Sequence, residues 1–181
     1  MRAHSIKTDN DGAENKVKLR IEATSHLESI KVLDLFAGEN KLWEKIKTDR
    51  YYGVEKEKNK GKNLNADNMR VIGSLDLRNF NVIDCDSYGV PTNQIASIFK
   101  NETLQEGTVI IYTAITNSMS RLNKEIIKHY NLTKIYKKAQ TLMNKKSHEL
   151  FYGYLNYKGI KKVYMYEKKA NFIKHYGYFF V

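Results

Sequence analysis

The most constraining feature of the sequence is a short apolar run, Lys31-Val-Leu-Asp-Leu-Phe36, that ends at the pair Ala37-Gly38. A run of this length bounded by glycine is typical of a buried β-strand that enters a tight turn. Residues 40–47 follow with helical character. A strand, a tight turn and a helix in this order predict the first unit of an α/β domain with a parallel sheet.

Further segments repeat this alternation along the chain. We expect strands at 51–55, 71–75, 81–86 and 108–114, helices at 92–100 and 119–130, a short helix within 56–69, and a strand or helix within 16–29. Two final strands, at 162–167 and 176–181, would form an antiparallel pair. The sequence therefore predicts a mostly parallel sheet of about seven strands, with a C-terminal antiparallel hairpin and helices on both faces.

The size of the chain, 181 residues, suits one domain, and we expect a polar arm at 1–15 followed by a single domain at 16–181. The one cysteine, Cys85, permits no internal disulfide, and the five histidines show no metal-ligand spacing. We therefore expect no metal site and a reducing, cytoplasmic location. No segment has the length and apolarity of a membrane span, and the first residues lack the apolar run of a signal peptide.

Charge is distributed unevenly along the chain. The net charge of +11 comes entirely from residues 121–181, which carry 14 Lys and Arg against three Glu and hold 13 of the 21 aromatic residues. Lysine pairs recur at 137–138, 145–146, 161–162 and 168–169, with tyrosines between them. Such a region suits a polyanion, and nucleic acid is the partner that we expect. The alternative is a solvated lysine face with tyrosines packed in strands.

Polar residues stand at the ends of the first two expected strands. Asp34 lies within an apolar strand, where a carboxylate needs backbone amides or a ligand as partners. Gly38 permits the tight turn and a close approach of a ligand to the backbone. Glu55 ends the second strand about 20 residues later, where an acid can accept both hydroxyls of a ribose. These three positions predict a nucleotide site at the carboxyl edge of the sheet.

Two segments, Val32-Leu-Asp-Leu-Phe-Ala-Gly-Glu-Asn40 and Tyr51-Tyr-Gly-Val-Glu55, resemble motifs I and II of class I S-adenosylmethionine-dependent methyltransferases. The resemblance implies a Rossmann-like fold and S-adenosylmethionine as the cofactor. It implies a cofactor site made of Asp34, Phe36, Ala37, Gly38, Asn40, Glu55, Lys56, Asp76, Leu77 and Asp84. In that family an acid after the third strand contacts the adenine amine, and Asp76 fits this role. Asn40 replaces a glycine that many members have, and Asn tolerates the left-handed conformation.

The segment Asp84-Cys-Asp-Ser-Tyr-Gly-Val-Pro91 places two carboxylates and an aromatic ring after the fourth strand. It is similar to motif IV of the exocyclic-amine methyltransferases, and in particular to the Asp-x-Asp-Pro-Tyr/Phe-Gly-Ser-Pro pattern of the tRNA guanine dimethyltransferases. The resemblance implies a catalytic corner of Asp86, Ser87 and Tyr88. Asp86 would hold the target amine and Tyr88 would stack on the base. Two positions depart from the pattern: Ser87 stands where the family has proline, and Val90 stands where it has serine.

Three interpretations remain open at this stage. The chain methylates an exocyclic amine of a nucleic-acid base, with RNA slightly ahead of DNA, or it methylates a protein or a small molecule. The third is a binding protein that keeps the fold without catalysis, which Asn40 and Ser87 favour. A site for NAD or FAD would need the pattern G-x-G-x-x-G after the first strand. Only Gly38 is present there, which argues against these two cofactors. Cys85 lies between two acids, so we expect a packed thiol and not a nucleophile. A partner subunit or a homodimer would supply target recognition.

Overall fold

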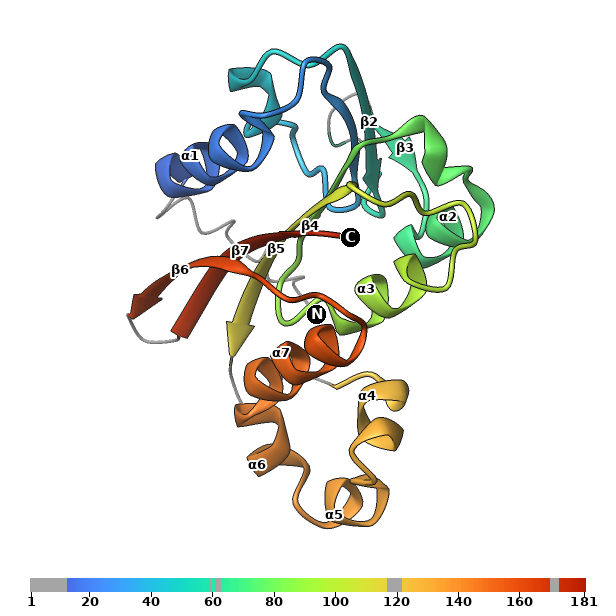
Figure 1. The fold of residues 1–181 in the computed structure, drawn as a ribbon, viewed down its shortest axis with the longest axis vertical. Coiled ribbons are helices and arrows are strands. Elements are labelled where there is room, and N and C mark those ends of the chain that lie inside the picture. Colours follow the sequence, from blue (N-terminus) through green and yellow to red (C-terminus); the bar gives the residue numbers. More distant parts are fainter. Residues whose placement is uncertain (1–12, 59, 61–62, 117–121, 170–172) are drawn as a thin grey trace, which may run out of the picture.

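The computed structural model describes residues 13–58, 60, 63–116, 122–169 and 173–181. These residues form a seven-stranded sheet in the order β3-β2-β1-β4-β5-β7-β6 (Figure 1). The strands are β1 (Lys31–Asp34), β2 (Arg50–Glu55), β3 (Leu64–Asn65), β4 (Val82–Asp86), β5 (Val109–Thr116), β6 (Tyr164–Lys169) and β7 (Ile173–Phe180). β1 to β5 run parallel, whereas β7 pairs antiparallel with both β5 and β6. The predicted sheet with its C-terminal hairpin is confirmed.

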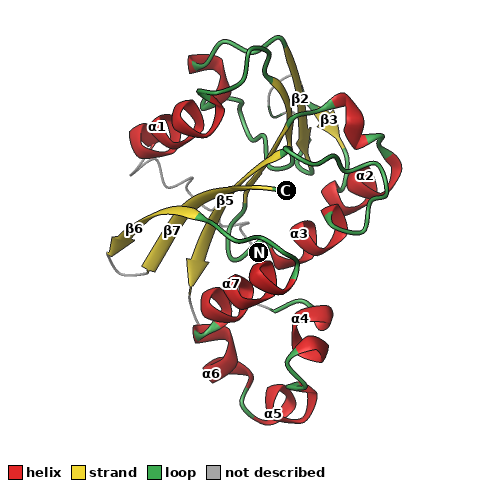
Figure 2. Ribbon diagram, viewed as in Figure 1, coloured by secondary structure: helices red, strands yellow, loops and turns green. Residues whose placement is uncertain are grey.

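Helices cover both faces of this sheet (Figure 2). The helices are α1 (Ala13–Thr24), α2 (Asn68–Ser74), α3 (Thr92–Ile98), α4 (Lys124–His129), α5 (Thr133–Lys138), α6 (Gln140–Lys145) and α7 (Ser147–Tyr157), with 3-10 turns η1 (Trp43–Lys45) and η2 (Leu77–Asn79). On one face, Leu19 of α1 packs in a cluster with Val82. On the other, Ile72, Ile95 and Phe151 from α2, α3 and α7 belong to the larger core cluster. None of the described helices is long and apolar enough to cross a membrane.

The expected third strand at 71–75 is wrong, because this segment lies in helix α2. Asp67 caps the helix: its Oδ1 accepts hydrogen bonds from the backbone N–H groups of Met69 and Arg70, at 3.0 and 3.4 Å. Val71 and Ile72 then face the core as neighbours on one side of the helix. The true third strand is the two-residue β3, which pairs with the end of β2. A polar N-cap before an apolar pair was the signal for a helix here.

Other boundaries also differ from the expectations. The ambiguous segment 16–29 is helical as far as Thr24, where α1 ends. This helix begins at Ala13 and so includes three residues assigned to the polar arm; residues 1–12 lie outside the described part of the chain. The expected helix at 40–47 is reduced to η1, because Ile46 already has an extended backbone. Within 119–130 the helix is α4, and residues 119–121 are outside the described residues. The division into an arm and one domain stays a prediction.

The segment between β5 and β6 contains three helices that the sequence did not lead us to expect. α5 and α6 are six residues each, too short to show a periodic apolar face, and α5 buries none of its residues. α7 is longer and packs on the sheet through Phe151, Tyr154 and Leu155. Figure 1 shows α4, α5 and α6 beyond the end of β5, so this part of the insertion, the helices α4 to α7 between β5 and β6, extends past the carboxyl edge of the sheet.

Candidate functional site

Three parallel strands each end on a carboxylate. β1 ends at Asp34, β2 at Glu55 and β4 at Asp86. β1 lies between β2 and β4 in the sheet, with Asp34 opposite Gly53 on one side and Asp84 on the other. Because the strands are parallel, their carboxyl ends meet at one edge, where ligands bind in open α/β sheets. The structure therefore brings these acids together at the edge that the sequence indicated.

The turn after β1 has the geometry of a ligand cradle. Gly38 has φ of +53°, and a Cβ built on it would meet nothing within 4 Å, so the space beside it is open. Asn40 also has a positive φ, of 65°, which bears out the expectation that it adopts the left-handed conformation. The Asn40 N–H donates to the carbonyl of Ala37 at 2.8 Å and closes the turn. An open, tightly wound backbone is what a large ligand needs for close approach.

Glu55 lies directly beside this turn. Its Oε2 accepts the backbone N–H of Gly38 at 3.0 Å, and its Oε1 accepts that of Glu57 at 2.9 Å. Asn63 reaches the same turn from the next loop and donates to the Gly38 carbonyl at 2.9 Å. Glu55 and Gly38, separated by 17 residues in the sequence, thus form one wall of the site.

Asp34 and Asp84 lie side by side on the neighbouring strands β1 and β4, and both are buried. Asp34 accepts the N–H of Phe36 at 3.1 Å and the hydroxyl of Tyr51 at 3.0 Å. Burial, reinforced by the nearby Asp84 charge, raises the pKa of Asp34 to about 8. Through these partners Asp34 anchors the turn from within the strand, and its expected place in a cofactor site stays a prediction.

Arg20 of helix α1 neutralises Asp84. Its guanidinium binds Asp84 Oδ2 through Nε at 2.8 Å and Nη2 at 2.6 Å, and the side chains are 1% and 0% exposed. The indole Nε1–H of Trp43 donates to the same oxygen at 2.7 Å. Burial nevertheless raises the pKa of Asp84, because desolvation outweighs the attraction of Arg20. A buried carboxylate held this tightly positions its neighbours and is not presented to a ligand.

Asp86 is the more accessible of the two acids of β4. Lys16 Nζ donates to both of its oxygens, at 2.9 and 2.8 Å, and Arg20 Nη2 lies 3.4 Å from Oδ2. Although its burial favours the neutral form, Lys16 and Arg20 hold the pKa of Asp86 below its usual range. Asp86 is therefore an ionised hydrogen-bond acceptor at neutral pH, which is the state needed to accept N–H bonds from an amine.

The two residues after Asp86 differ in exposure. Ser87 is buried, and its hydroxyl, which has one proton to donate, lies within hydrogen-bond distance of the carbonyls of Gly89 and Thr113, at 3.2 and 3.3 Å. Tyr88 is 70% exposed, so its ring is available for stacking beside Asp86. Gly89, with φ of 124°, turns the chain here. Ser87 therefore braces the corner at the position where the motif that it resembles has proline, and the turn forms without that residue.

Neither a family model nor a curated protein matches this sequence, but solved structures do. Trm1 from Pyrococcus horikoshii, in complex with S-adenosyl-L-methionine, matches with a TM-score of 0.56 at 12% identity, over 95% of this chain and 56% of the Trm1 chain. A SAM-dependent methyltransferase from Archaeoglobus fulgidus matches with a TM-score of 0.54 at 11% identity, over 93% of each chain. This chain has the fold of these methyltransferases. Plantazolicin methyltransferase BamL, solved with a triazolic desmethylPZN analog and SAH, matches similarly, with a TM-score of 0.54 at 10% identity, over 93% of this chain and 84% of BamL.

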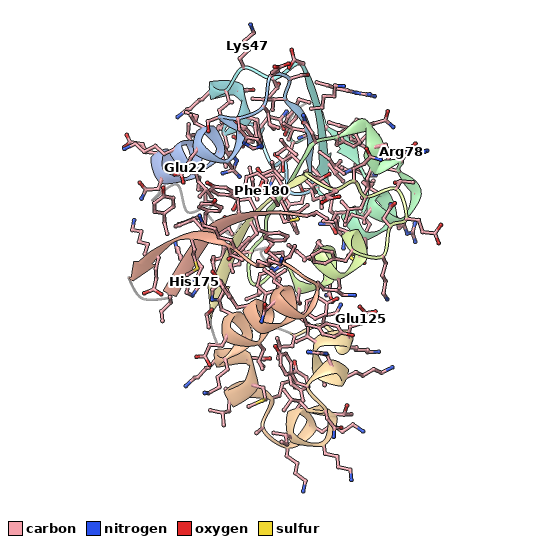
Figure 3. The ribbon with its side chains drawn as sticks, viewed as in Figure 1. Glu22, Lys47, Arg78, Glu125, His175 and Phe180 are labelled. Atoms are coloured by element: carbon pink, nitrogen blue, oxygen red, sulfur yellow. The ribbon has the colours of Figure 1, made fainter. Side chains whose placement is uncertain are left out.

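Within this methyltransferase fold, Asp76 and Leu77 do not occupy the expected place. Both follow helix α2, which leads away from the carboxyl edge, and they precede the start of β4 at the opposite edge. The Asp76 carboxylate binds Arg78, at 2.7 Å, and Figure 3 shows Arg78 on the outer flank of the molecule. Leu77 is fully buried in the core. The assignment of these two residues rested on a strand that does not exist.

The acid that does follow the third strand is Asp67, two residues after β3. The N–H of Ala66, between them, donates to the carbonyl of Glu55 at 3.1 Å, which ties this corner to the end of β2. Lys56 is exposed beside it, and its carbonyl accepts the side-chain amide of Asn65 at 2.9 Å. The expected role of Lys56 in a cofactor site stays a prediction.

Sequence reasoning missed the contribution of helix α1 and of two aromatic residues. Lys16 and Arg20 stand four residues apart, so both point from one face of α1 towards β4. That spacing was the signal, but it has meaning only once 16–29 is known to be helical. Trp43 and Tyr51, which bind Asp84 and Asp34, carried no signal beyond their residue type.

Cys85, between the two acids of β4, points into the core on the opposite side. It is fully buried, and burial together with the neighbouring acids raises the pKa of its thiol well above the ordinary value. The expectation of a packed thiol is confirmed. In the described part of the chain, no group of His, Cys, Asp and Glu side chains is arranged to hold a metal ion.

Proposed function

We propose that this chain is an S-adenosylmethionine-dependent methyltransferase that acts on an exocyclic amine of an RNA base. The observation that carries the proposal is that three residues lie at one edge of the sheet: Gly38 in the turn after β1, Glu55 at the end of β2 and Asp86 at the end of β4. The first two suit a nucleoside-containing methyl donor, and the third suits an amine. The methyltransferase fold supports this interpretation, because the donor and acceptor positions fall in the order that the resemblance implies.

The described residues fit the methyl donor. The open face of Gly38 leaves room for the donor against the backbone of the turn, and the Glu55 carboxylate beside it can accept the two ribose hydroxyls in place of its backbone partners. Asp67, after β3, takes over the role that the resemblance first gave to Asp76, namely to accept the adenine amine. When bound, the donor supplies a methyl group on a sulfonium, which is activated towards nucleophilic attack.

Asp86 provides what a poorly nucleophilic amine needs. The lone pair of an exocyclic amine is delocalised into the base, and an ionised carboxylate that accepts its N–H bonds helps to localise that pair on nitrogen. The nitrogen then forms a bond to the methyl carbon while the carbon–sulfur bond breaks and its electron pair stays on sulfur. The nitrogen finally loses one proton to water. Because the pKa of Asp86 is lowered, Asp86 acts as an acceptor and not as a strong base.

Tyr88 and the basic insertion support a nucleic-acid substrate. A tyrosine that is 70% exposed next to the acceptor carboxylate can stack on an unpaired base. In the insertion, Lys134, Lys137 and Lys138 of α5 are all exposed, and this helix buries none of its residues. This solvated lysine face lies at the end of the helical segment α4 to α7 that is farthest from the sheet (Figure 1), and it can meet phosphates of a nucleic acid that extends beyond the site.

Transfer of tritium from labelled S-adenosylmethionine to total RNA, DNA or protein tests the proposal. We expect label in RNA, and we expect Asp86→Asn to abolish transfer while the Kd for the donor changes by less than about twofold. Glu106→Ala, which removes an exposed carboxylate elsewhere, is the matched control and should keep full activity. Label in protein would assign a different substrate class. Donor binding without any transfer would leave a binding protein on this fold, whereas equal loss of transfer and donor affinity in Asp86→Asn would make that carboxylate structural.

A further inference from the structure

The Asp86 carboxylate already has a full set of hydrogen-bond donors. Lys16 Nζ donates to Oδ1 and Oδ2 at 2.9 and 2.8 Å, Arg20 Nη2 approaches Oδ2 at 3.4 Å, and the Thr113 hydroxyl also donates to this side chain. A carboxylate offers about four acceptor directions. These four contacts use them, so a target amine can bind Asp86 only if one of the present donors leaves.

Lys16 is the donor that can leave at the smallest cost. Arg20 is 1% exposed and is held independently by Asp84, and Thr113 is buried within strand β5. Lys16 is 19% exposed at the end of a flexible side chain, near the start of α1, so its ammonium can move directly into water. Loss of Lys16 would leave Asp86 with the charge of Arg20 and the hydroxyl of Thr113 beside it.

We propose that Lys16 occupies the place of the target amine on Asp86 and that the substrate displaces Lys16. The first turns of α1 then act as a latch over the acceptor corner, which consists of Asp86, Ser87 and Tyr88. This inference rests on the proposed function, because the competitor is the acceptor amine. The latch also selects the substrate. A group that displaces an ammonium must bring N–H donors of its own, whereas a keto oxygen at the same place would face a carboxylate with no proton between them.

Steady-state kinetics with total RNA as the acceptor test the latch, with Lys16→Met as the variant. Met keeps the unbranched apolar part of the side chain and removes the ammonium. We expect the KM for RNA to fall about five- to tenfold, as for loss of one partly exposed charged hydrogen bond, with an unchanged Kd for S-adenosylmethionine. Lys18→Met, which removes an exposed lysine of the same helix, is the control and should change neither constant. A KM that is unchanged or raised overturns the proposal, and so does a weaker Kd for the donor, which would place Lys16 in the donor site.

Hydrogen exchange of the α1 amides tests the latch without any need for activity. We expect Asp86→Asn to speed exchange in the first two turns of α1. Adenosine or guanosine monophosphate should do the same in the wild-type protein, whereas inosine monophosphate, which lacks an exocyclic amine, should not. If no acceptor is methylated but Asp86→Asn still loosens α1, the proposed function fails and the latch contact stands. If α1 exchanges at the same rate in Asp86→Asn, the latch is refuted whatever the enzyme assay shows.

Discussion

Replacement of Arg20 by methionine should destabilise the fold strongly and in a pH-dependent manner. Arg20 binds Asp84 at 2.6 Å, with the two side chains 1% and 0% exposed, and removal of one partner from such a pair costs about 3–5 kcal/mol. For a domain of this size that loss lowers Tm by about 10 °C. Without Arg20 the folded pKa of Asp84, already raised by burial, rises further above the unfolded value of about 3.9. The carboxyl is then protonated more readily in the folded than in the unfolded state, so the loss of stability grows as pH rises from 5 to 8.

Urea denaturation of Arg20→Met at pH 5 and pH 8 measures both effects. Lys18→Met, an exposed change on the same helix, should stay within about 0.5 kcal/mol of the wild type. Adding Asp84→Asn to Arg20→Met removes the uncompensated charge, and we expect the double variant to recover about half of the lost stability. A loss below about 1 kcal/mol that is equal at the two pH values would refute the reasoning that a buried ion pair fixes α1 to the sheet.

Three further outcomes follow from other parts of the structure. Glu55→Gln should weaken binding of S-adenosylmethionine by about tenfold in calorimetry, because two hydrogen bonds to a charged acceptor are reduced; unchanged affinity would place the ribose elsewhere. Gly177→Ala should lower the free energy of unfolding by about 1–3 kcal/mol, since its Cβ would lie 2.7 Å from the Tyr112 ring, which Phe151 and Phe179 confine; an unchanged urea midpoint would show that the ring can move. Cys85 should not react with an aromatic disulfide reagent until the protein unfolds, because the thiol is buried and its pKa is raised, and rapid labelling of the native protein would contradict this placement.

The sequence was informative wherever burial on both faces left little choice of structure. β4 and β5 are buried along nearly their whole length, and both were placed from the β-branched and apolar residues that a central strand prefers, although β4 also carries Asp84 and Asp86. β3 could not be found, since two exposed residues, Leu64 and Asn65, carry no periodicity and pair only because β2 offers an edge. The short helices of the insertion escaped notice for the same reason.

In the candidate site, too, some residues could be placed from the sequence and others could not. Gly38 and Glu55 could be placed from the sequence because each needs a single local feature, a tight turn or the end of a strand. The cations that control the acids of β4 could not be foreseen. Arg20 lies 64 residues from Asp84 and Lys16 lies 70 residues from Asp86, and only the packing of α1 on the sheet brings them together.

That long separation limits how far the protein can be trimmed. A fragment of residues 31–116 would retain every motif of the donor and acceptor corners, together with all five parallel strands. It would lack the helix that supplies the countercharge to Asp84, and its interior would hold two adjacent acids with no cation to offset them. Excising the motif-bearing segment as a minimal catalyst, or grafting it into another scaffold, therefore requires the upstream helix as part of the same unit.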